Sequence, residues 1–486
     1  MQFIGIDVGT LSTKGCLVAV DGRVLCRAAI SHETQSPRPG WVEQDPEAVW
    51  WAETCEIIRR LLEHPDADTS SIAGLGVSGM FPALALVDEG GQPLRPALLY
   101  SDNRAARELA AFNERFGLIL TGDALPPKLA WLRANEPDIF SQARYFLSSH
   151  NYVGFRLTGA YYLDYKVADS MGGLLDRTTL KWREDVADWA GIDVAHLPRL
   201  CSESEIAGEV TQSAAEETGL KAGTPLVVGS GDSPLTIISA GAIERGDALL
   251  SLGTSGWMGV LPYRLAEYYE NPTLLHQGAP YLLEAYVLAV GSALRWFRDQ
   301  FAVGEQAVAR RLGTSAYKML DDEAAKVPPG SDGLIVLPYF LGGREPEIPL
   351  PETATMTGLT LSHTAAHVYR ALLESYGYVV RWSLERLEER GIPVKRIVAT
   401  GGGASSKLWR QILSDIIGQP LHYHADTDPC LANAYLVGYA LGSWDSLEGI
   451  RDWLPPSVVA EPSENAHLIY DKVYHRFLAL QLMHSK

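Results

Sequence analysis

Residues 1–15 read MQFIGIDVGTLSTKG, an apolar run that ends in Asp7, a Gly9-Thr10 pair, further hydroxyls and a lysine. The run FIGIDVG predicts a buried strand, KGCLVAV predicts a second strand, and the Asp-Gly turn of VDGRVL leads into a third. The chain is therefore expected to begin with a β-meander, and the first tight turn of this meander is rich in polar groups.

A related turn appears 244 positions later, about half the chain of 486 residues. There DALLSLGTSGWMGV places Gly253-Thr254-Ser255 between two predicted strands. Self-similarity at half length predicts two similar domains that face one another across a cleft, with the two turns sharing one ligand. A chain of this length also exceeds what one small core needs. We place the two domains at residues 1–243 and 244–486.

The rest of the chain mixes strands and helices. DPEAVWWAETCEIIRRLLEH predicts a helix with Asp45 as N-cap, and SIAGLGVSG predicts a strand. Further along, TAAHVYRALLESYGYVVRWSLERLEER predicts a long amphipathic helix. The strand KRIVATGGG precedes the helix SSKLWRQILSDIIG, so its glycine turn leaves backbone N–H groups free for a ligand. The fold class is therefore α/β with mixed sheets.

Composition excludes several classes of function. The formal charge of −18 argues against a protein that tracks nucleic-acid backbones or lies on anionic lipid. The five scattered cysteines include no C-x-x-C pair, which predicts free thiols in a reducing compartment. We found neither a secretory leader pattern nor an apolar run of membrane-spanning length, so we expect a cytoplasmic protein.

The first turn suits a phosphate group. Backbone N–H groups and the hydroxyls of Thr10, Ser12 and Thr13 can donate to phosphate oxygens, Lys14 offers positive charge, and Asp7 can hold a hydrated magnesium ion. A plain tight turn between two strands is the alternative. The second turn at Gly253-Thr254 favours the phosphate site.

Between the two turns, TPLVVGSGDSPLT presents Asp232 after a strand and a glycine turn. The small neighbours would let a substrate hydroxyl approach this carboxylate, which favours a general base. Because Asp232 also precedes Ser-Pro, it suits the N-cap of the next helix equally well. Spacing does not decide between these two roles.

Other patterns carry less weight. GLGVSG at 74–79 matches G-x-G-x-x-G, but its glycines lie in a strand that another strand follows, which disfavours a dinucleotide site. The histidines of HTAAH lack a third ligand, and we interpret them as helix-start and surface residues. The sequence contains no P-loop pattern.

Taken together, the motifs resemble the FGGY carbohydrate kinases of the actin and hexokinase ATPase superfamily. The resemblance extends over almost the whole chain and rests on these motifs in order: IGIDVGTLSTK, PGWVEQDP, SDNR, PKLAWL, NEP, RLTG, GSGD, SLGTSG, GLTLSHTAAHVYRALLES and TGGGASSKLWRQILSDIIG. It implies two duplicated, ribonuclease H-like ATPase domains with mixed sheets that flank a central cleft. It also implies an enzyme that passes the γ-phosphoryl group of ATP to a sugar or polyol hydroxyl, with Mg²⁺.

The resemblance implies a role for each matched residue. Asp232 would be the catalytic base, and Asp7 would help to hold magnesium with Asp232 beside it. The N-terminal half would bind the sugar, with Asp102 and Arg104 near its sugar end, and the C-terminal half would bind the nucleotide. The phosphates would lie between Gly9, Thr10, Ser12, Thr13 and Lys14 on one side and Gly253 and Thr254 on the other, and the adenosine would pass close to Gly401, Gly402, Gly403 and Ala404.

The chain departs from the family pattern at the sugar end. Xylulokinase-like members carry Gln-Met-His-Gly where this chain has Met80, Phe81, Pro82 and Ala83, so the sugar-contacting histidine is missing. Phe81 adds apolar surface, and we expect a drier pocket or one shaped for a different polyol. Tyr100 stands where tryptophan is common, and the segment Arg344-Glu345-Pro346 differs from the usual Gly-Glu-Arg-Thr-Pro.

We therefore expect an ATP-dependent kinase for a ketose or polyol, with a pentulose such as D-xylulose as the first acceptor to test. Gluconate, glycerol, erythritol and ribulose are alternative acceptors. A non-catalytic regulator that binds sugar or nucleotide is an alternative of another class, although retention of Asp7, Asp232 and both turns disfavours it. The expected ligands are a small sugar or polyol and ATP, and a homodimer is left open.

Overall fold

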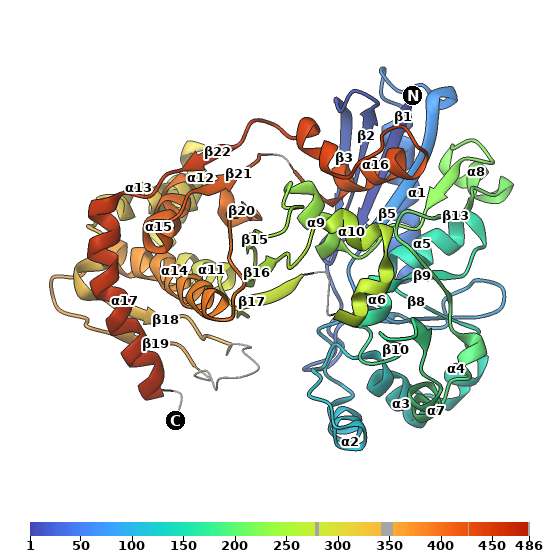
Figure 1. The fold of residues 1–486 in the computed structure, drawn as a ribbon, viewed down its shortest axis with the longest axis horizontal. Coiled ribbons are helices and arrows are strands. Elements are labelled where there is room, and N and C mark those ends of the chain that lie inside the picture. The colour runs from blue at the N-terminus through green and yellow to red at the C-terminus, as the bar shows by residue number, and fades with distance from the viewer. Residues whose placement is uncertain (278–280, 342–352, 426, 485–486) are drawn as a thin grey trace. The chain divides into compact units, whose positions relative to one another are not determined.

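A computed structural model describes residues 1–277, 281–341, 353–425 and 427–484 of the chain (Figure 1). The segment Arg344-Glu345-Pro346 lies outside the described residues.

The chain forms two compact units, and neither is continuous in sequence. The first unit comprises Met1–Ser239, Leu265–Pro280 and Thr427–Trp453, and the second comprises Ala240–Arg264, Tyr281–Asp426 and Leu454–Lys486. The division at 243 and 244 into a sugar half and a nucleotide half remains a prediction.

The first unit is built on a six-stranded mixed sheet in the order β13-β14-β5-β1-β2-β3. The meander expected from the opening sequence is present, since β1 pairs antiparallel with β2, which pairs antiparallel with β3. On its other side β1 pairs parallel with β5, and β5 pairs parallel with β14. The strands are β1 Gln2–Val8, β2 Ser12–Ala19, β3 Val24–Ser31, β5 Ile72–Gly79, β13 Ile206–Glu209 and β14 Pro225–Val227.

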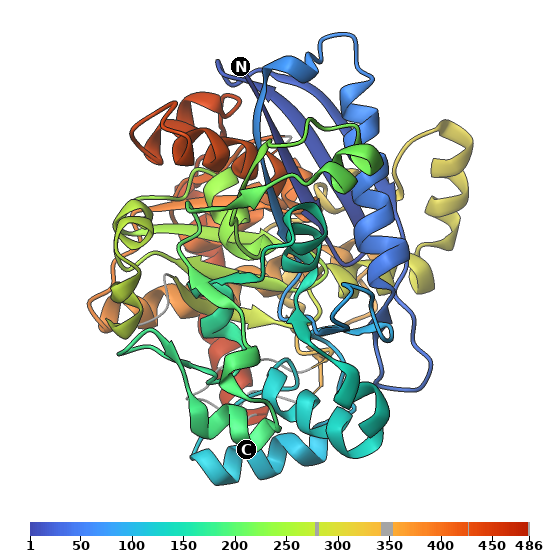
Figure 2. The same ribbon diagram turned by 90° about the vertical axis from the view of Figure 1, so that its right-hand side faces the viewer.

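Helices cover both faces of this sheet because glycines let them approach. A Cβ atom on Gly5 would lie 1.9 Å from the carbonyl oxygen of Cys430 in α16 (Pro429–Ala440). A Cβ atom on Gly15 would lie 2.5 Å from Ile57 in α1 (Ala52–Leu62). Gly5 pairs with Cys16 and Gly15 pairs with Ile6, so the two glycines face opposite sides of the sheet. Figure 2 shows α1, in blue, along the strands of the meander.

The predicted helix at 45–64 begins with a π-helical segment, Pro46–Trp51, and continues as α1. Asp45 caps this segment as expected, since its side chain accepts hydrogen bonds from the N–H groups of Glu47 and Ala48 at 2.9 and 3.1 Å. Asp45 is therefore confirmed as a cap.

Smaller elements lie between β3 and β14 and after β14. The short strands are β4 Glu43–Gln44, β6 Ala85–Val87, β7 Ala97–Leu98, β8 Tyr145–Leu147, β9 Tyr162–Asp164, β10 Leu175–Asp176, β11 Lys181–Trp182 and β12 Arg199–Cys201. The helices are α2 Ala106–Phe116, α3 Leu125–Asn135, α4 Pro137–Gln142, α5 Ser149–Thr158, α6 Tyr165–Ser170, α7 Glu184–Ala190, α8 Gln212–Thr218, α9 Asp232–Ser239 and α10 Leu265–Glu270.

The second unit repeats the sheet of the first. Its six strands run in the order β17-β16-β15-β20-β21-β22, with an antiparallel meander β15-β16-β17 and parallel pairs β15-β20 and β20-β21. The strands are β15 Asp247–Leu252, β16 Gly256–Val260, β17 Leu282–Val287, β20 Arg396–Thr400, β21 Leu421–Tyr423 and β22 Val458–Ala460, and β18 Ile335–Leu337 pairs with β19 Thr355–Thr357 apart from them. The internal duplication predicted from the two Gly-Thr turns is confirmed.

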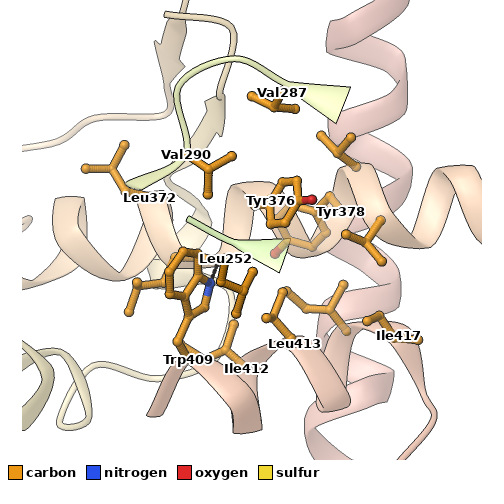
Figure 3. Packing of buried hydrophobic residues seen from close by; sticks show 14 of the residues in the cluster. Leu252, Val287, Val290, Leu372, Tyr376, Tyr378, Trp409, Ile412, Leu413 and Ile417 are labelled. Atoms are coloured by element: carbon orange, nitrogen blue, oxygen red, sulfur yellow. Dashed lines mark hydrogen bonds between the residues drawn. The ribbon is translucent and has the colours of Figure 1, made fainter. Parts of the chain in front are cut away.

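The core of the second unit lies between this sheet and two long helices, α14 (Ala365–Glu389) and α15 (Lys407–Ile417) (Figure 3). Leu252, the last residue before the Gly253-Thr254 turn, belongs to the same buried cluster as Trp409 and Ile412. The indole N–H of Trp409 donates to the carbonyl of Leu373 at 3.0 Å. The remaining helices are α11 Gly291–Phe301, α12 Val303–Leu312, α13 Ala316–Ala324 and α17 Glu464–His484.

The five cysteines are free thiols, as expected. None of the helices in the described part of the chain combines the length and the apolar character that a membrane span requires.

Candidate active site

Three strand ends of the first unit bring the candidate residues together. Parallel strands end at one edge of a sheet, and β1, β5 and β14 are parallel neighbours. Asp7 lies at the end of β1, opposite Ser78 of β5, and an isolated bridge joins Gly79 to Gly231 beyond β14. Asp7 and Asp232 are thus separated by one strand, which places their Cα atoms about 10 Å apart. This edge carries two carboxylates.

Asp7 is nearly buried, with 6% of its surface exposed. The hydroxyl of Ser78 donates to its Oδ1 at 2.7 Å, and Asn433 of α16 in turn donates to that hydroxyl at 2.8 Å. Burial raises the pKa of Asp7 to about 6, against the lowering effects of the Ser78 hydrogen bond and of the positive charge on Lys14. Asp7 therefore takes up a proton at a higher pH than an ordinary aspartate does.

Asp232 is the first residue of α9 and is half-buried. Burial, and then the negative charge of Asp7, raise its pKa to about 7, while the hydroxyl of Ser233 donates to Oδ1 at 3.2 Å and lowers it. A carboxylate whose pKa lies close to neutrality is well matched to general-base work. Asp232 is the first residue of α9 and not the residue before it, and its carboxylate accepts a hydrogen bond from the Ser233 hydroxyl, so the structure does not place it at the N-cap position of this helix.

Phe81 forms a wall beside Asp232. A Cβ atom on Gly231 would lie 2.0 Å from Cδ1 of Phe81, so the aromatic ring packs directly on the backbone that precedes Asp232. Met80 differs, because only 1% of its surface is exposed and its side chain belongs to the core. Of Met80 and Phe81, both expected to bind substrate, Phe81 alone presents a partly exposed side chain.

The first Gly-Thr turn is closed by the N–H of Gly9, which donates to the carbonyl of Ser12 at 3.0 Å. Lys14 pairs with Asp7 across the meander, so Lys14 and Ser12 share the face of Asp7. Thr13 points to the opposite face. It is fully buried and its hydroxyl donates to Glu53 at 2.7 Å, so this hydroxyl is not presented to a phosphate as the sequence suggested.

Glu53 also binds His32. Nδ1 of His32 lies 2.8 Å from Glu53, and Nε2 lies 3.1 Å from the carbonyl oxygen of Gly9. The turn is therefore stabilised by contacts with Thr13, Glu53 and His32, and Thr13 lies on the face of β2 opposite Asp7. The sequence analysis missed Glu53 and His32, because nothing in their local sequence connects them to a turn 23 or more residues away.

The carboxylate pair fits a magnesium ion that takes its other ligands from elsewhere. The described residues contain no group of three or more histidine, cysteine or carboxylate side chains that could hold a metal ion. Mg²⁺ keeps several waters and uses one or two carboxylates together with substrate phosphates. Asp7 would hold such an ion, with Asp232 nearby.

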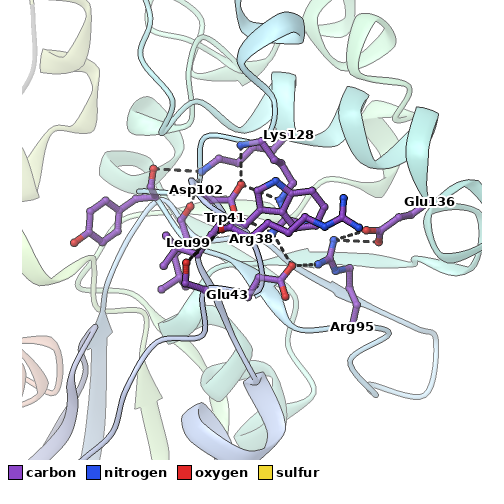
Figure 4. Close-up of polar contacts among 12 residues, drawn as sticks. Arg38, Trp41, Glu43, Arg95, Leu99, Asp102, Lys128 and Glu136 are labelled. Carbon is purple, nitrogen blue, oxygen red and sulfur yellow. Dashed lines mark hydrogen bonds and ion pairs between the residues drawn. The ribbon is translucent and has the colours of Figure 1, made fainter.

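Asp102 and Arg104 belong to a buried ionic cluster, in which Figure 4 labels Asp102, Glu43 and Lys128. The side chains of Asp102 and Arg104 are fully buried. Arg104 donates to Asp102 through Nε at 2.9 Å and Nη2 at 2.8 Å, and also to Glu43 at 2.6 Å. Its guanidinium carbon lies 3.8 Å from the ring centre of Trp41 and 5.2 Å from that of Trp131. Its Nη1 has no hydrogen-bond partner among the described residues.

Most members of this cluster could not be recognised from the local sequence. Lys128 is fully buried and donates to the carbonyl of Leu99 at 2.6 Å, and burial lowers its pKa to about 8. Glu43 also binds Arg95, which pairs with Glu136 at 3.0 Å. Lys128 lies in the motif PKLAWL, where a lysine within an apolar run is a local signal that could have indicated a buried charge.

The second unit holds a pocket of about 1040 Å³. The Gly253-Thr254 turn lines it, together with Gly402 and Gly403 of the second glycine turn. The turn is held close to α11, because a Cβ atom on Gly291 would lie 2.3 Å from the carbonyl oxygen of Gly253. Gly401 and Ala404, also expected near adenosine, do not line this pocket.

Most of the other pocket residues come from α11, α13, α14 and α15, and the remainder from the end of β15 and from the segments next to α13 and α15; they were not predicted from the sequence. Asp321 accepts a hydrogen bond from Ser406 at 2.7 Å and one from Tyr369 at 3.3 Å, and burial raises its pKa. The polar and charged members of the lining are Arg295, Ser315, Tyr317, Lys318, Asp321, Asp322, Tyr369, Ser405, Ser406, Lys407 and Gln411.

Comparison with known proteins gives a consistent result. Residues 2–239 match the N-terminal domain, and residues 248–441 the C-terminal domain, of the FGGY family of carbohydrate kinases. Gluconokinase of Bacillus subtilis (strain 168) is 30% identical over 500 residues, covering 98% of this chain and 95% of that protein. Xylulose kinase of the same strain is 29% identical over 461 residues, covering 92% and 89%. The crystal structure of xylulose kinase from Rhodospirillum rubrum superposes with a TM-score of 0.86 at 29% identity, covering 99% of each chain.

Proposed function

Since the chain belongs to the FGGY family of carbohydrate kinases, we propose that it transfers the γ-phosphoryl group of ATP to a hydroxyl of a ketose or polyol. The observation that carries this proposal is the pair Asp7 and Asp232 at one sheet edge, with pKa values raised to about 6 and about 7. D-xylulose is the first acceptor to test.

Asp232 acts as the general base in this proposal. It takes the proton of the acceptor hydroxyl, whose oxygen forms a bond to the γ-phosphorus while the bond from that phosphorus to the β,γ-bridging oxygen breaks and ADP leaves. A base with a pKa of about 7 is sufficiently ionised at physiological pH and still strong enough to take the proton. Phosphoryl transfer otherwise depends on positioning and on neutralisation of charge.

The first turn and Asp7 hold the phosphate end of the substrate. Ser12 and Lys14 lie on the face of Asp7 and supply a hydroxyl and a positive charge there. Magnesium, when bound by Asp7, neutralises phosphate charge. Thr13 contributes indirectly, since its contact with Glu53 stabilises the turn.

The pocket of the second unit binds the nucleoside end of ATP. Its volume of about 1040 Å³ suits a nucleotide, and its glycine turns at 253 and 402–403 allow close approach to backbone N–H groups. Asp321 is held by Ser406 and Tyr369 beside this pocket, so it is oriented for a polar contact with the nucleotide.

The acceptor is the least constrained part of the proposal. Relatives named gluconokinase and xylulose kinase are equally similar to this chain, at 30% and 29% identity. Pro82 stands where xylulokinase-like proteins carry a histidine, and Phe81, the residue before it, packs on Gly231 next to the base. This change removes a polar contact to the sugar, so gluconate is the second candidate.

A coupled assay of ADP release tests the proposal. Purified protein is given ATP and Mg²⁺ with D-xylulose, ribulose, gluconate, glycerol or erythritol in parallel, and Asp232→Asn is the matched control. We expect turnover with at least one acceptor and little ADP release without any acceptor. ATP binding without turnover on every acceptor would contradict the proposal and favour a regulator.

A further inference from the structure

The loop that presents Asp232 contains one side chain other than Asp232 itself, and it is tied to a distant part of the first unit. Ser230 lies in Gly229-Ser230-Gly231, between β14 and α9. Its hydroxyl donates to Oδ1 of Asp164 at 2.8 Å, and both residues are fully buried. A short, well-buried hydrogen bond to a carboxylate is among the stronger polar contacts in proteins.

Asp164 is itself rigidly placed. It is the last residue of β9, and its Oδ1 accepts a second hydrogen bond, at 2.9 Å, from the N–H of Val167 in the first turn of α6. Its Oδ2 lies 3.3 Å from Nε2 of His150 in α5, which is also fully buried. Three elements therefore fix the carboxylate that holds Ser230.

The rest of the loop is held through its backbone. The N–H of Gly229 donates to the carbonyl of Glu203 at 3.0 Å, and Gly229 has a positive φ of 67°. Gly231 lies under the ring of Phe81. Because glycines are conformationally permissive, the hydroxyl of Ser230 is the side-chain contact that selects one conformation for the residue before Gly231 and Asp232.

We propose that Ser230 and Asp164 are positioning residues for Asp232. The proposal rests on the proposed function, in which Asp232 is the base. The hydrogen bond between them fixes the direction in which the Gly229–Gly231 loop delivers the Asp232 carboxylate toward the acceptor hydroxyl. Displacement of a reacting group by about 1 Å can cost a hundredfold in rate, so this tether affects turnover more than binding.

Other charged groups surround the tether. His150 faces Asp164 from α5, Lys166 faces it from α6, and Glu203 precedes β13, with the hydroxyl of Tyr268 donating to Glu203 at 2.8 Å. Burial lowers the pKa of Lys166, and burial followed by the charge of Asp164 raises that of Glu203 to about 8. Variants that change the charge of Asp164 therefore need a control that keeps its hydrogen bond.

The test compares four single variants and one double variant in the assay of ADP release. Ser230→Ala and Asp164→Ala remove the tether from either side, whereas Asp164→Asn keeps a carbonyl oxygen that can accept the same hydrogen bond. Ser239→Ala is the matched control, because Ser239 is a buried serine of α9 whose hydroxyl donates only to the carbonyl of Thr236. We expect kcat to fall about tenfold or more in the two alanine variants, with KM for ATP within twofold of wild type.

We expect Asp164→Asn and Ser239→Ala to keep kcat within about threefold of wild type, and the double variant Ser230→Ala, Asp164→Ala to be no slower than the slower single variant. Unchanged kcat in Ser230→Ala, or a loss in Asp164→Asn as large as in Asp164→Ala, would overturn the proposal. If Asp164→Ala does not fold, the comparison of Ser230→Ala, which loses the hydrogen bond, with Asp164→Asn, which keeps it, still tests the proposal.

Hydrogen exchange of the backbone supplies a readout that needs no turnover. We expect peptides covering residues 228–235 to exchange faster in Ser230→Ala than in wild type or in Ser239→Ala. If Ser230→Ala exchanges faster but the protein phosphorylates no acceptor, the positioning role of the Ser230–Asp164 hydrogen bond is supported and the proposed function is contradicted. If all variants exchange equally and the protein does phosphorylate an acceptor, the positioning role of Ser230 and Asp164 is contradicted and the proposed function is not.

Discussion

The two Gly-Thr turns occupy the same register in two similar sheets, but only the first follows a carboxylate. In the first sheet Asp7 pairs with Ser78 across the parallel strands, two residues before Gly9. In the second sheet Ser251 pairs with Thr400, two residues before Gly253. The duplicated scaffold thus places an acid and a hydroxyl in one copy and two hydroxyls in the other.

The surroundings of the two turns also differ, as do the residues that precede them. The first turn adjoins the buried carboxylate of Asp7 and the half-buried carboxylate of Asp232, both with raised pKa values. The second opens on a pocket of about 1040 Å³ that is lined by glycines, aromatic and apolar side chains and a set of charged and hydroxyl groups. One scaffold can therefore serve proton transfer in one copy and ligand binding in the other. Few side chains at the strand ends are needed to specialise each copy.

The largest effect is expected for Asp232→Asn. Loss of the base should lower kcat about a thousandfold or more, while KM for ATP changes little, because the nucleotide pocket lies in the second unit. Steady-state kinetics of ADP release measure both. A variant with turnover close to wild type would contradict the role of Asp232.

The same variant should be more stable than wild type at high pH. The folded-state pKa of Asp232 is raised from 3.8 to about 7, so its ionised form opposes folding above pH 7, and this opposition disappears below about pH 4. We expect Asp232→Asn to gain about 1–3 kcal/mol at pH 8 after allowance for partial exposure, and nothing at pH 4. Urea unfolding at the two pH values tests this, and equal stability at pH 8 would contradict it.

Asp7→Asn and Ser251→Ala compare the two copies directly. We expect Asp7→Asn to lower kcat about a hundredfold and to weaken the dependence on Mg²⁺, because in the proposed function this carboxylate would hold the ion. Ser251→Ala, at the matching position of the second sheet, should change kcat less than about threefold. Equal losses in the two variants would remove the distinction between the copies.

The pH profile should follow the two carboxyl groups. Because Asp232 has a pKa of about 7, kcat/KM should fall about tenfold per pH unit below pH 7, and the slope should steepen below about pH 6 as Asp7 takes a proton. Saturating Mg²⁺ should move the steeper part of the profile, which reflects protonation of Asp7, to lower pH, since the metal competes with the proton. A profile that is flat between pH 5 and 8 would exclude these groups.

The smallest effects separate two threonines. Thr254→Val removes a hydroxyl from the nucleotide pocket and should raise KM for ATP about tenfold. Thr13→Val leaves Glu53 without one buried donor and should cost about 1–2 kcal/mol of stability, with KM for ATP within twofold of wild type. Thermal unfolding and kinetics of both variants test this. A raised KM for ATP in Thr13→Val, with an unchanged KM in Thr254→Val, would show that Thr13 and not Thr254 contacts the nucleotide.

Most of the fold could be predicted from local sequence. The meander, the Asp45 cap, the glycine turns and the repeat depend on neighbours along the chain, and the structure confirms them. The alternation of side chains in a strand was the signal overlooked at Thr13, since a residue next to Lys14 must face the other side of β2. Met80 was likewise assigned to the substrate although its side chain lies in the core.

The sequence by itself determined that two duplicated α/β units carry two Gly-Thr turns, that Asp7 lies at the end of a strand and that Asp232 comes after one, because each of these features depends on a pattern within a few residues. Only the tertiary structure decided which groups surround them. Asn433 reaches Ser78 across 355 residues, and Asp164 reaches Ser230 across 66. Burial and neighbouring charge then set the pKa of each carboxyl, and both arise only when distant segments pack together.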